Sequence, residues 1–431
     1  MCKIVTGDVT HLLALNERIS EAMFAGAGMP VSAARARSTL FNEMSTLFVP
    51  PCHTANMQQT VSIIGAGPAG FALAADLQNH GKDVLVYSHP THQRHANIIK
   101  ERGRLEARGA MEGFAHIDLT SDMAEAVAFS KILILTVPST GQETVLHELK
   151  NFPLRRHTII AIPGNLFSLV AADLEVGCIF ETNLSPYSCR MDENGLTVLG
   201  RKSLIFIAPF LPRGRRVNPS LYATIQDLFP IQLRWCSSIA EVCLSNVNGI
   251  FHPLMMLMNA GRIESTAGDF LLYRDGLTGS VANAMLAVDR VRIRIGKAFG
   301  LQLKSAVEIS NECYGQSFAD FVELARNSPP HNKLRAPATL GNRNISEDVP
   351  DLLVCWCSLG EKLGVDVAPI KAVIVLVEMV TGVNYSETGR NLGKLGLEDL
   401  SQEELVARFS SGAPPRVVVN PGGEDTILSR L

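Results

Sequence analysis

A short apolar run, a glycine-rich turn and a helical stretch follow one another directly near residue 60. Val61–Ile64 is β-rich and apolar, Gly65–Gly70 has the spacing G-x-G-x-x-G, and Phe71–His80 has helical character. A second β-rich run ends some 23 residues after Gly65, at Val84–Tyr87. Glycine turns are common, but this order of strand, turn and helix is what a phosphate-binding βαβ unit requires.

Each glycine of the turn has a physical role in such a unit. Gly65 permits the tight turn, Gly67 lets the backbone approach a pyrophosphate, and Gly70 lets helix and strand pack closely. The free N–H groups and the dipole at the helix start then hold the phosphates. The alternative is a glycine turn in a doubly wound fold that binds no cofactor. The context favours a dinucleotide site.

Similar β-rich runs recur along the first half of the chain and alternate with helical stretches. They are Val61–Ile64, Val84–Tyr87, Ile132–Val137, Thr158–Ile162, Cys178–Glu181 and Leu204–Ala208. Continuous apolar strands that alternate with helices are typical of a parallel sheet covered on both faces. We therefore expect an α/β Rossmann domain over residues 59–236.

The pattern changes after residue 236, where long apolar stretches at helical spacing replace the strand signals. These stretches are Pro253–Ile263, Val281–Gly300, Val307–Asn327, Val349–Leu363 and Pro369–Val380. We expect an all-helical domain over residues 237–410, preceded by an extension of unknown role at 1–58 and followed by a disordered tail at 411–431.

Composition excludes several classes of function. A net charge of −3 gives no reason to expect nucleic acid or an anionic membrane as a partner. No apolar run reaches membrane-spanning length, and no secretory signal is seen. Nine cysteines without a repeated spacing indicate free thiols in a reducing compartment, so we expect a cytoplasmic protein. Cys355 and Cys357 face different ways on a helix and have no partner pair, so we expect no metal site.

The segment after the second strand bears on the choice of cofactor. NAD-preferring sites usually place a carboxylate there, whereas Tyr87–Arg94 contains only hydroxyls, imidazoles and an arginine. Arg94, with Ser88 or Thr91, is suited to a 2′-phosphate. We therefore favour NADP(H), with NAD(H) as the alternative if this segment is only a solvated loop. Thr136 and Pro138 end another buried strand and should border the ribose and nicotinamide.

Two segments of the helical part carry candidate catalytic residues. Pro253 should disfavour helical backbone angles at His252 and should itself begin a buried helix. His252 would then lie just before the first residue of that helix. A structural histidine at a helix end is the simpler interpretation. Asp348 should begin the helix that ends near Gly364, where a capping role would explain it. That role leaves Arg343 unexplained.

Residues 59–396 resemble the octopine/nopaline dehydrogenase family, the opine dehydrogenases. The segments that carry the resemblance are Gly65–Gly70, His252–Glu264, Phe270–Gly276, Arg343–Pro350 and Gly389–Leu392. Thr136–Gln142 and Ser185–Arg190 further resemble the crown-gall octopine synthase branch, which uses NADPH. The resemblance implies a Rossmann domain followed by an all-α domain of the 6-phosphogluconate-dehydrogenase-like type.

The resemblance also implies an activity, the reductive condensation of an amino acid with a 2-oxo acid through an imine. His252 and Asp348 match the family's acid/base pair, and Arg343 matches the arginine for a substrate carboxylate. Pyruvate or 2-oxoglutarate would be the 2-oxo acid, with a basic amino acid as the first guess for the amine. The expected assembly is a monomer or homodimer. The alternatives are a ketopantoate-type 2-oxo acid reductase and a non-catalytic NADP(H)-binding sensor.

Overall fold

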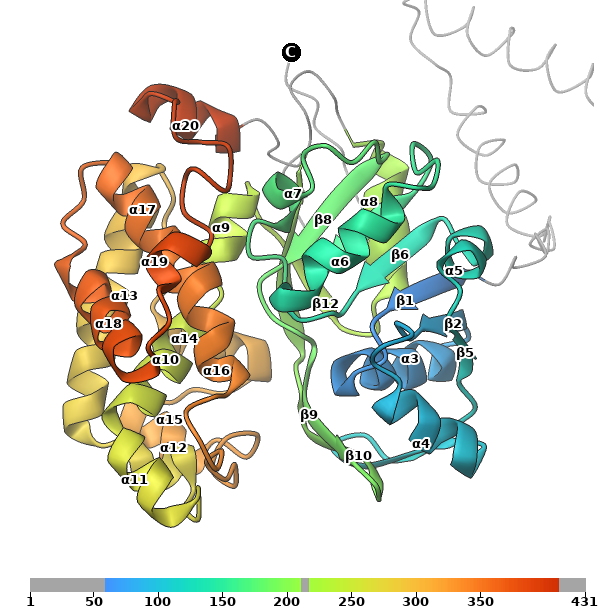
Figure 1. Cartoon of the computed structure of the whole chain (residues 1–431), viewed down its shortest axis with the longest axis horizontal. Coiled ribbons are helices and arrows are strands. Elements are labelled where there is room, and N and C mark those ends of the chain that lie inside the picture. The colour runs from blue at the N-terminus through green and yellow to red at the C-terminus, as the bar shows by residue number, and fades with distance from the viewer. Residues whose placement is uncertain (1–58, 211–216, 411–431) are drawn as a thin grey trace, which may run out of the picture. The chain divides into compact units, whose positions relative to one another are not determined.

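The computed structural model describes residues 59–210 and 217–410. The predicted extension at 1–58 and tail at 411–431 lie outside the described residues. Up to Trp235 the described chain contains both strands and helices, and from Ile239 onward its elements are all helical (Figure 1). This order confirms the predicted fold class, a Rossmann-type domain followed by a helical one. We propose that the domain boundary lies between these two residues.

The larger sheet has eight strands, in the order β12-β11-β8-β7-β6-β1-β2-β5. All adjacent pairs are parallel except β8 and β11, which are antiparallel. The strands are β1 (Thr60–Ile64), β2 (Asp83–Tyr87), β5 (Asp118–Thr120), β6 (Ile132–Leu135), β7 (Thr158–Ala161), β8 (Cys178–Thr182), β11 (Leu204–Phe210) and β12 (Gln232–Trp235). The six predicted strands are all present, and β5 and β12 are additional.

The apolar run of each central strand is explained by burial on both faces of this sheet. Ile63 and Ile134 belong to one buried cluster, whereas Ile64 and Leu135 belong to another. Because successive strand residues point to opposite faces, a strand covered on both sides has no polar face. The helices of this domain are α3 (Pro68–Asn79), α4 (Arg94–Arg102), α5 (Met123–Phe129), α6 (Ser139–Leu149), α7 (Phe167–Val170) and α8 (Pro219–Leu228).

A smaller four-stranded sheet, which the sequence analysis missed, has the order β4-β3-β10-β9. Its strands are β3 (Leu105–Gly109), β4 (Gly113–Ala115), β9 (Tyr187–Asp192) and β10 (Gly195–Arg201). One side of it packs on α3, where Tyr187 donates to Asp76 Oδ2 at 2.6 Å and Arg201 Nε donates to the same oxygen at 2.8 Å. The pairing of β3 with β10 joins segments about 90 residues apart, which local patterns do not reveal.

The second domain is all-helical within the described residues. Its helices are α9 (Ile239–Leu244), α10 (Asn248–Met258), α11 (Ala260–Thr266), α12 (Leu272–Gly276), α13 (Gly279–Ala298), α14 (Ala306–Tyr314), α15 (Phe321–Asn327), α16 (Arg343–Ser346), the π-helical turn η1 (Val349–Leu353), α17 (Val354–Lys362), α18 (Ala368–Thr381), α19 (Tyr385–Thr388) and α20 (Gln402–Ser410). The predicted helix over Val307–Asn327 is in fact two, because Gly315 ends α14 in the left-handed region at φ 64°.

The predicted start of α10 at Pro253 is wrong. The helix begins five residues earlier, and Pro253 lies inside it, so His252 is in the helix interior and not at its mouth. Proline there removes one helical hydrogen bond and strains the turn before it. Burial of Ile250, Phe251 and Leu254 in the helical core offsets that cost. Tertiary packing thus overrides the local preference.

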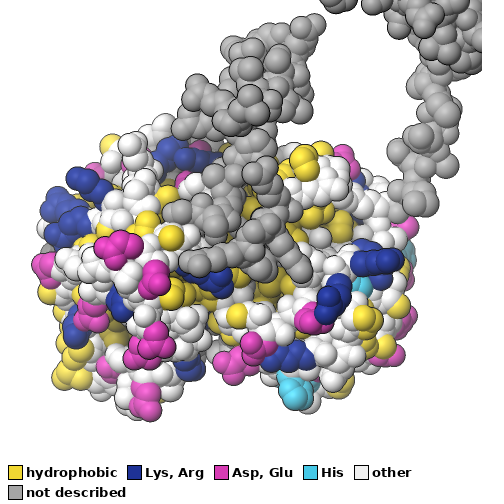
Figure 2. Space-filling view, turned by 90° about the horizontal axis from the view of Figure 1, so that it is seen from above, with side chains coloured by type: hydrophobic (Ala, Val, Ile, Leu, Met, Phe, Trp, Pro, Cys, Tyr) yellow, Lys and Arg dark blue, Asp and Glu magenta, His cyan; other side chains and the backbone are white. Residues whose placement is uncertain are grey.

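Charge and thiols agree with an ordinary globular surface. In Figure 2, positive and negative side chains are interspersed over the part of that face left visible. The seven cysteines among the described residues are all free and buried. A search of the described helices finds none long and apolar enough to cross a membrane.

Candidate active site

Three loops meet at the carboxyl ends of β1, β2 and β6. Ile64, at the end of β1, lies in register with Tyr87 of β2 and Leu135 of β6, so the chain leaves all three strands at one level. The glycine turn, the Ser88–Arg94 segment and Thr136–Pro138 follow these ends directly. Open parallel sheets bind ligands at such an edge. The predicted cofactor residues are therefore close together.

The glycine turn fits a dinucleotide. Gly65 has φ +132°, in the region that favours glycine. A Cβ added at Gly70 would lie 2.0 Å from the Gly65 carbonyl oxygen, whereas one at Gly67 would meet nothing within 4 Å. Thr136 Oγ1 donates to the Gly65 carbonyl at 3.0 Å and so supports the turn. Open space at the N-terminus of α3 is what a pyrophosphate would need.

Alanine at Gly70 and at Gly67 should therefore have different effects. Gly70→Ala forces the turn and α3 apart, and we expect a loss of about 1–3 kcal/mol in the free energy of unfolding. Gly67→Ala should leave that free energy unchanged and weaken NADPH binding by roughly tenfold or more, about 1.4 kcal/mol. Urea denaturation and NADPH fluorescence titration measure the two effects. Equal loss of stability in both variants would contradict the assignment.

The segment after β2 is tightly folded. Ser88 is buried, and its hydroxyl donates to the His92 carbonyl at 3.3 Å, so it is already engaged. Arg94 begins α4 and is exposed. His95, which the sequence analysis missed, hydrogen-bonds the backbone of Ala66 in the glycine turn; burial lowers the pKa of its imidazole, and that bond partly opposes the shift. Arg94 is thus the free cation of this segment.

The structure joins His252 to Asp348. The Nδ1 atom of His252 lies 2.6 Å from Asp348 Oδ2, and their side chains are only 18% and 10% exposed. An ionised carboxylate can only accept, so in a neutral imidazole with this hydrogen bond Nδ1 is the donor and the Nε2 lone pair is left free. Helix capping was the simpler of two interpretations of Asp348, but its side chain makes no capping hydrogen bond at η1. That carboxylate instead orients the imidazole.

Arg343 begins α16, five residues before Asp348, and its side chain is exposed. It forms no ion pair with another described residue, although Glu347 lies nearby. Burial raises the pKa of Glu347 to about 7 despite the charge of Arg343. At neutral pH this carboxyl therefore leaves much of the positive charge of Arg343 uncompensated.

A second histidine near the pair, His331, escaped the sequence analysis. Burial first, and then the charges of Lys202 and His252, lower its pKa to about 3, so it is neutral at physiological pH. Its ring centroid lies 4.8 Å from that of Tyr273 and 5.2 Å from that of Tyr314. His331 therefore packs among aromatic side chains close to His252.

Arg390 connects the two domains beside the site. Its Nη1 donates to the carbonyls of Gly164 at 3.1 Å and of Asn165, and its Nη2 donates to Gln142. Its Nε lies 3.2 Å from Asp351 Oδ1, in the same π-helical turn that Asp348 precedes. π-Helical turns are rare in proteins, and those that occur are often found at functional sites.

Asp351 also faces the nucleotide-binding domain. Burial raises the pKa of its carboxyl, while Arg390 and the Ser139 hydroxyl oppose the shift. Ser139 is the first residue of α6 and follows Pro138 directly. The His252–Asp348 pair is thereby linked through η1 to the edge predicted for the nicotinamide.

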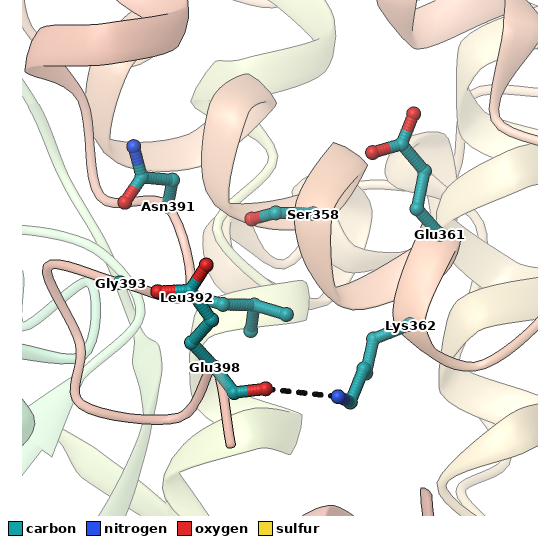
Figure 3. Close-up of a pocket in the computed structure, with 7 residues that line it drawn as sticks. All are labelled: Ser358, Glu361, Lys362, Asn391, Leu392, Gly393 and Glu398. Atoms are coloured by element: carbon teal, nitrogen blue, oxygen red, sulfur yellow. Dashed lines mark hydrogen bonds between the residues drawn. The ribbon is translucent and has the colours of Figure 1, made fainter. Parts of the chain in front are cut away.

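A shallow pocket of about 470 Å³ lies elsewhere on the helical domain (Figure 3). Its lining residues are Ser358, Glu361, Lys362, Asn391, Leu392, Gly393 and Glu398. Lys362 Nζ donates to the Glu398 carbonyl at 2.9 Å. None of the predicted site residues lines it.

A phosphate-binding turn on a parallel sheet, coupled to a histidine–carboxylate pair on a helical domain, defines a two-domain nicotinamide-dependent oxidoreductase. Residues 235–381 match the family model of the NAD/NADP octopine/nopaline dehydrogenase α-helical domain, and residues 60–164 match that of the NAD-dependent glycerol-3-phosphate dehydrogenase N-terminus. The opine dehydrogenase of Arthrobacter sp. (strain 1C) is 30% identical over 358 residues, 80% of this chain and 96% of that protein. The chain belongs to the opine dehydrogenase family.

Other relatives agree with this assignment. Protein ocs of Agrobacterium vitis is 27% identical over 353 residues, covering 80% of this chain and 98% of that protein. A solved structure of octopine dehydrogenase with NADH and L-arginine has the same fold, with a TM-score of 0.64 at 17% identity, covering 81% of this chain and 98% of that one. The family's members are NAD(P)-dependent oxidoreductases that act on CH–NH bonds. Reductive condensation is therefore better supported than simple 2-oxo acid reduction.

Proposed function

We propose that this enzyme joins an amino acid to pyruvate or 2-oxoglutarate, with His252 and Asp348 as its acid/base pair and Arg343 as a ligand of the 2-oxo acid carboxylate. The observation that carries these roles is the 2.6 Å hydrogen bond between His252 and Asp348, formed across 96 residues of sequence. A carboxylate that orients a histidine leaves the other ring nitrogen free for proton transfer.

The chemistry gives His252 two tasks. Its Nε2 first takes a proton from the substrate ammonium, so that the neutral amine can attack the carbonyl carbon and form the C–N bond. The imidazolium then returns a proton to the carbinolamine hydroxyl, which leaves as water and yields the protonated imine, whose nitrogen keeps the remaining proton of the substrate ammonium. Asp348 stabilises the charged ring between these steps. The nicotinamide cofactor, when bound, supplies the hydride that reduces the imine carbon.

Arg343 supplies the charge that this reaction needs in a substrate ligand. A guanidinium can hold a carboxylate through two parallel hydrogen bonds, which fixes the orientation as well as the position of the 2-oxo acid. Its side chain is exposed and free of ion pairs within the described chain. Arg343 begins α16, five residues before Asp348 of the acid/base pair.

NADPH is the proposed cofactor. No carboxylate follows β2 in the Ser88–Arg94 segment, and Arg94 is exposed at the start of α4. Since Ser88 is engaged locally, Arg94 carries this proposal. A single guanidinium–phosphate hydrogen bond contributes roughly 1.5–3 kcal/mol.

Arg94→Ala should therefore raise KM for NADPH by roughly tenfold or more and change KM for NADH much less. Steady-state kinetics with each cofactor measure both constants. Arg102→Ala, at the exposed end of the same helix, is the matched control and should change neither. An equal effect of Arg94→Ala on both cofactors would remove the 2′-phosphate argument.

Amine dependence separates this function from a 2-oxo acid reductase. We expect NADPH oxidation in the presence of pyruvate or 2-oxoglutarate to require an added amino acid. Oxidation at the same rate without any amine would support the reductase. Binding of NADPH without turnover over a broad substrate panel would support a sensor. The buried free thiols of the described residues support the proposed cytoplasmic location, and we propose a monomer or homodimer.

A further inference from the structure

Two arginines near the catalytic pair form no ion pair with another described residue. Arg343 begins α16, and Arg190 lies on β9. The described contact of the Arg190 guanidinium is a 3.3 Å hydrogen bond from Nη1 to the neighbouring Cys189 carbonyl. That bond leaves Nη2 and Nε of Arg190 free to donate to a ligand. The proposed function gives Arg343 a substrate carboxylate and gives Arg190 no ligand.

The strand register sets the direction of Arg190. Tyr187 and Cys189 point into the core of the nucleotide-binding domain. Ser188 therefore points the other way; it pairs with Gly200, where an added Cβ would meet Pro330 at 2.5 Å and Tyr314 at 3.2 Å. Arg190 stands two residues from Ser188 and shares its face. Arg190 thus faces the helical domain, and Figure 1 shows β9 on that side of the sheet domain.

The two arginines approach the helix of His252 from opposite sides. Tyr314, which borders Gly200 beside β9, lies 5.2 Å from the His331 ring, and α16, which begins with Arg343, packs against α10. Partial removal from solvent, and then the positive charge of Arg343, lower the pKa of Arg190. Both guanidiniums also act on the Cys189 thiol, and Arg190 acts on Tyr273, as does Asp348 of the catalytic pair. Two positive charges that act on each other repel, and an anion bound between them would relieve that repulsion.

The carboxyl groups in reach do not fill that role. Asp348 is hydrogen-bonded to His252, and Glu347, whose pKa burial raises to about 7, carries only part of a negative charge at neutral pH. Two guanidiniums without ion pairs are therefore suited to a ligand with two negative charges. The product of reductive condensation has one carboxylate from each substrate.

We propose that Arg190 and Arg343 form a two-carboxylate site, in which Arg343 holds the carboxylate of the 2-oxo acid and Arg190 holds the α-carboxylate of the amino acid. The inference rests on the proposed function for the identity of the two substrates. It makes Arg190 the residue that distinguishes an α-amino acid from a simple amine.

Binding of a minimal analogue tests this site without turnover. Iminodiacetate is a secondary amine with two carboxylates, and sarcosine is the corresponding amine with one. Full-length enzyme saturated with NADPH is titrated with each compound by calorimetry. We expect iminodiacetate to bind at least tenfold more tightly than sarcosine, and Arg190→Gln or Arg343→Gln to abolish that difference.

Arg108→Gln is the matched control for general charge. Arg108 is an exposed arginine on β3 of the same small sheet, and its ion pair with Glu106 is also exposed. We expect this variant to retain the full preference for iminodiacetate. NADPH affinity should be unchanged in all three variants, which shows that they remain folded. Wild-type preference for iminodiacetate in Arg190→Gln would overturn the proposal.

Kinetics then assign each arginine to a substrate. Arg190→Gln should raise KM for the amino acid at least tenfold and leave KM for the 2-oxo acid nearly unchanged, and Arg343→Gln should do the reverse. Arg190→Lys should recover part of the loss, because it keeps the charge but not the paired hydrogen bonds. If the wild-type enzyme forms the secondary amine but Arg190→Gln has the same KM for the amino acid as the wild type, the two-carboxylate site is wrong and the proposed function still stands. If no substrate pair gives a secondary amine, the proposed function fails instead.

Discussion

Replacement of His252 by alanine should lower kcat for reductive condensation by about 10²–10⁴-fold, the usual contribution of a positioned acid/base group. The variant loses the group that deprotonates the amine and protonates the leaving hydroxyl. NADPH binding should be unchanged, because the glycine turn and α4 belong to the other domain. Stopped-flow turnover and NADPH fluorescence titration measure the two properties separately.

Asp348→Asn should also lower kcat while cofactor affinity stays constant. An amide keeps a hydrogen bond to Nδ1 of His252, which it meets at 2.6 Å as a carboxylate, but no longer stabilises the imidazolium. His147→Ala, an exposed histidine on α6, is the matched control and should retain wild-type turnover. Near-wild-type condensation by either the His252 or the Asp348 variant would contradict the catalytic assignment.

Replacement of Arg390 by alanine should destabilise the folded protein by about 3–5 kcal/mol, because it leaves buried carboxylates without their partner. Arg390 and Asp351 are each only 6% exposed. The positive charge of Arg390 also acts on the carboxyl group of Glu181, which is fully buried in β8. The variant also loses the hydrogen bonds to the Gly164 and Asn165 carbonyls. Urea denaturation followed by circular dichroism measures the change.

Arg294→Ala is a suitable control for this experiment. That arginine is exposed on α13 and donates one hydrogen bond, to the Asp366 carbonyl at 3.1 Å. Its removal should change the free energy of unfolding by less than about 0.5 kcal/mol. Arg390→Lys should fall between the two, since it keeps the charge but cannot reach all the partners. A stability of Arg390→Ala close to wild type would show that the interdomain contact is not structural.

Much of the nucleotide-binding domain could be predicted from sequence because its strands are buried on both faces. Ile132–Leu135 is apolar throughout, so it is visible without knowledge of its neighbours. The smaller sheet lacks that signal. Its strand β3 contains the charged residues Glu106, which is half-buried, and Arg108, which is exposed, and it pairs with residues about 90 positions away. Long-range pairing of polar strands has no local pattern.

The site could be predicted only in part for the same reason. Gly65–Gly70 is a local motif whose geometry follows from steric rules. The contact of His252 with Asp348 spans 96 residues, and family resemblance, rather than spacing, selected the two residues. Arg390 contacts Gly164 across 226 residues, and only the resemblance at Gly389–Leu392 drew attention to it.

The central claim is that hydride reaches a carbon that has just become bonded to the substrate nitrogen. The direct test is mass spectrometry of reactions that contain the full-length enzyme, a 2-oxo acid, a panel of amino acids and NADPH deuterated at the transferable position. We expect a secondary amine whose mass is that of the two substrates less one water plus two hydrogens, with one deuterium on the former carbonyl carbon as one of those two hydrogens. A deuterated 2-hydroxy acid, with no nitrogen incorporated for any amino acid, would contradict it.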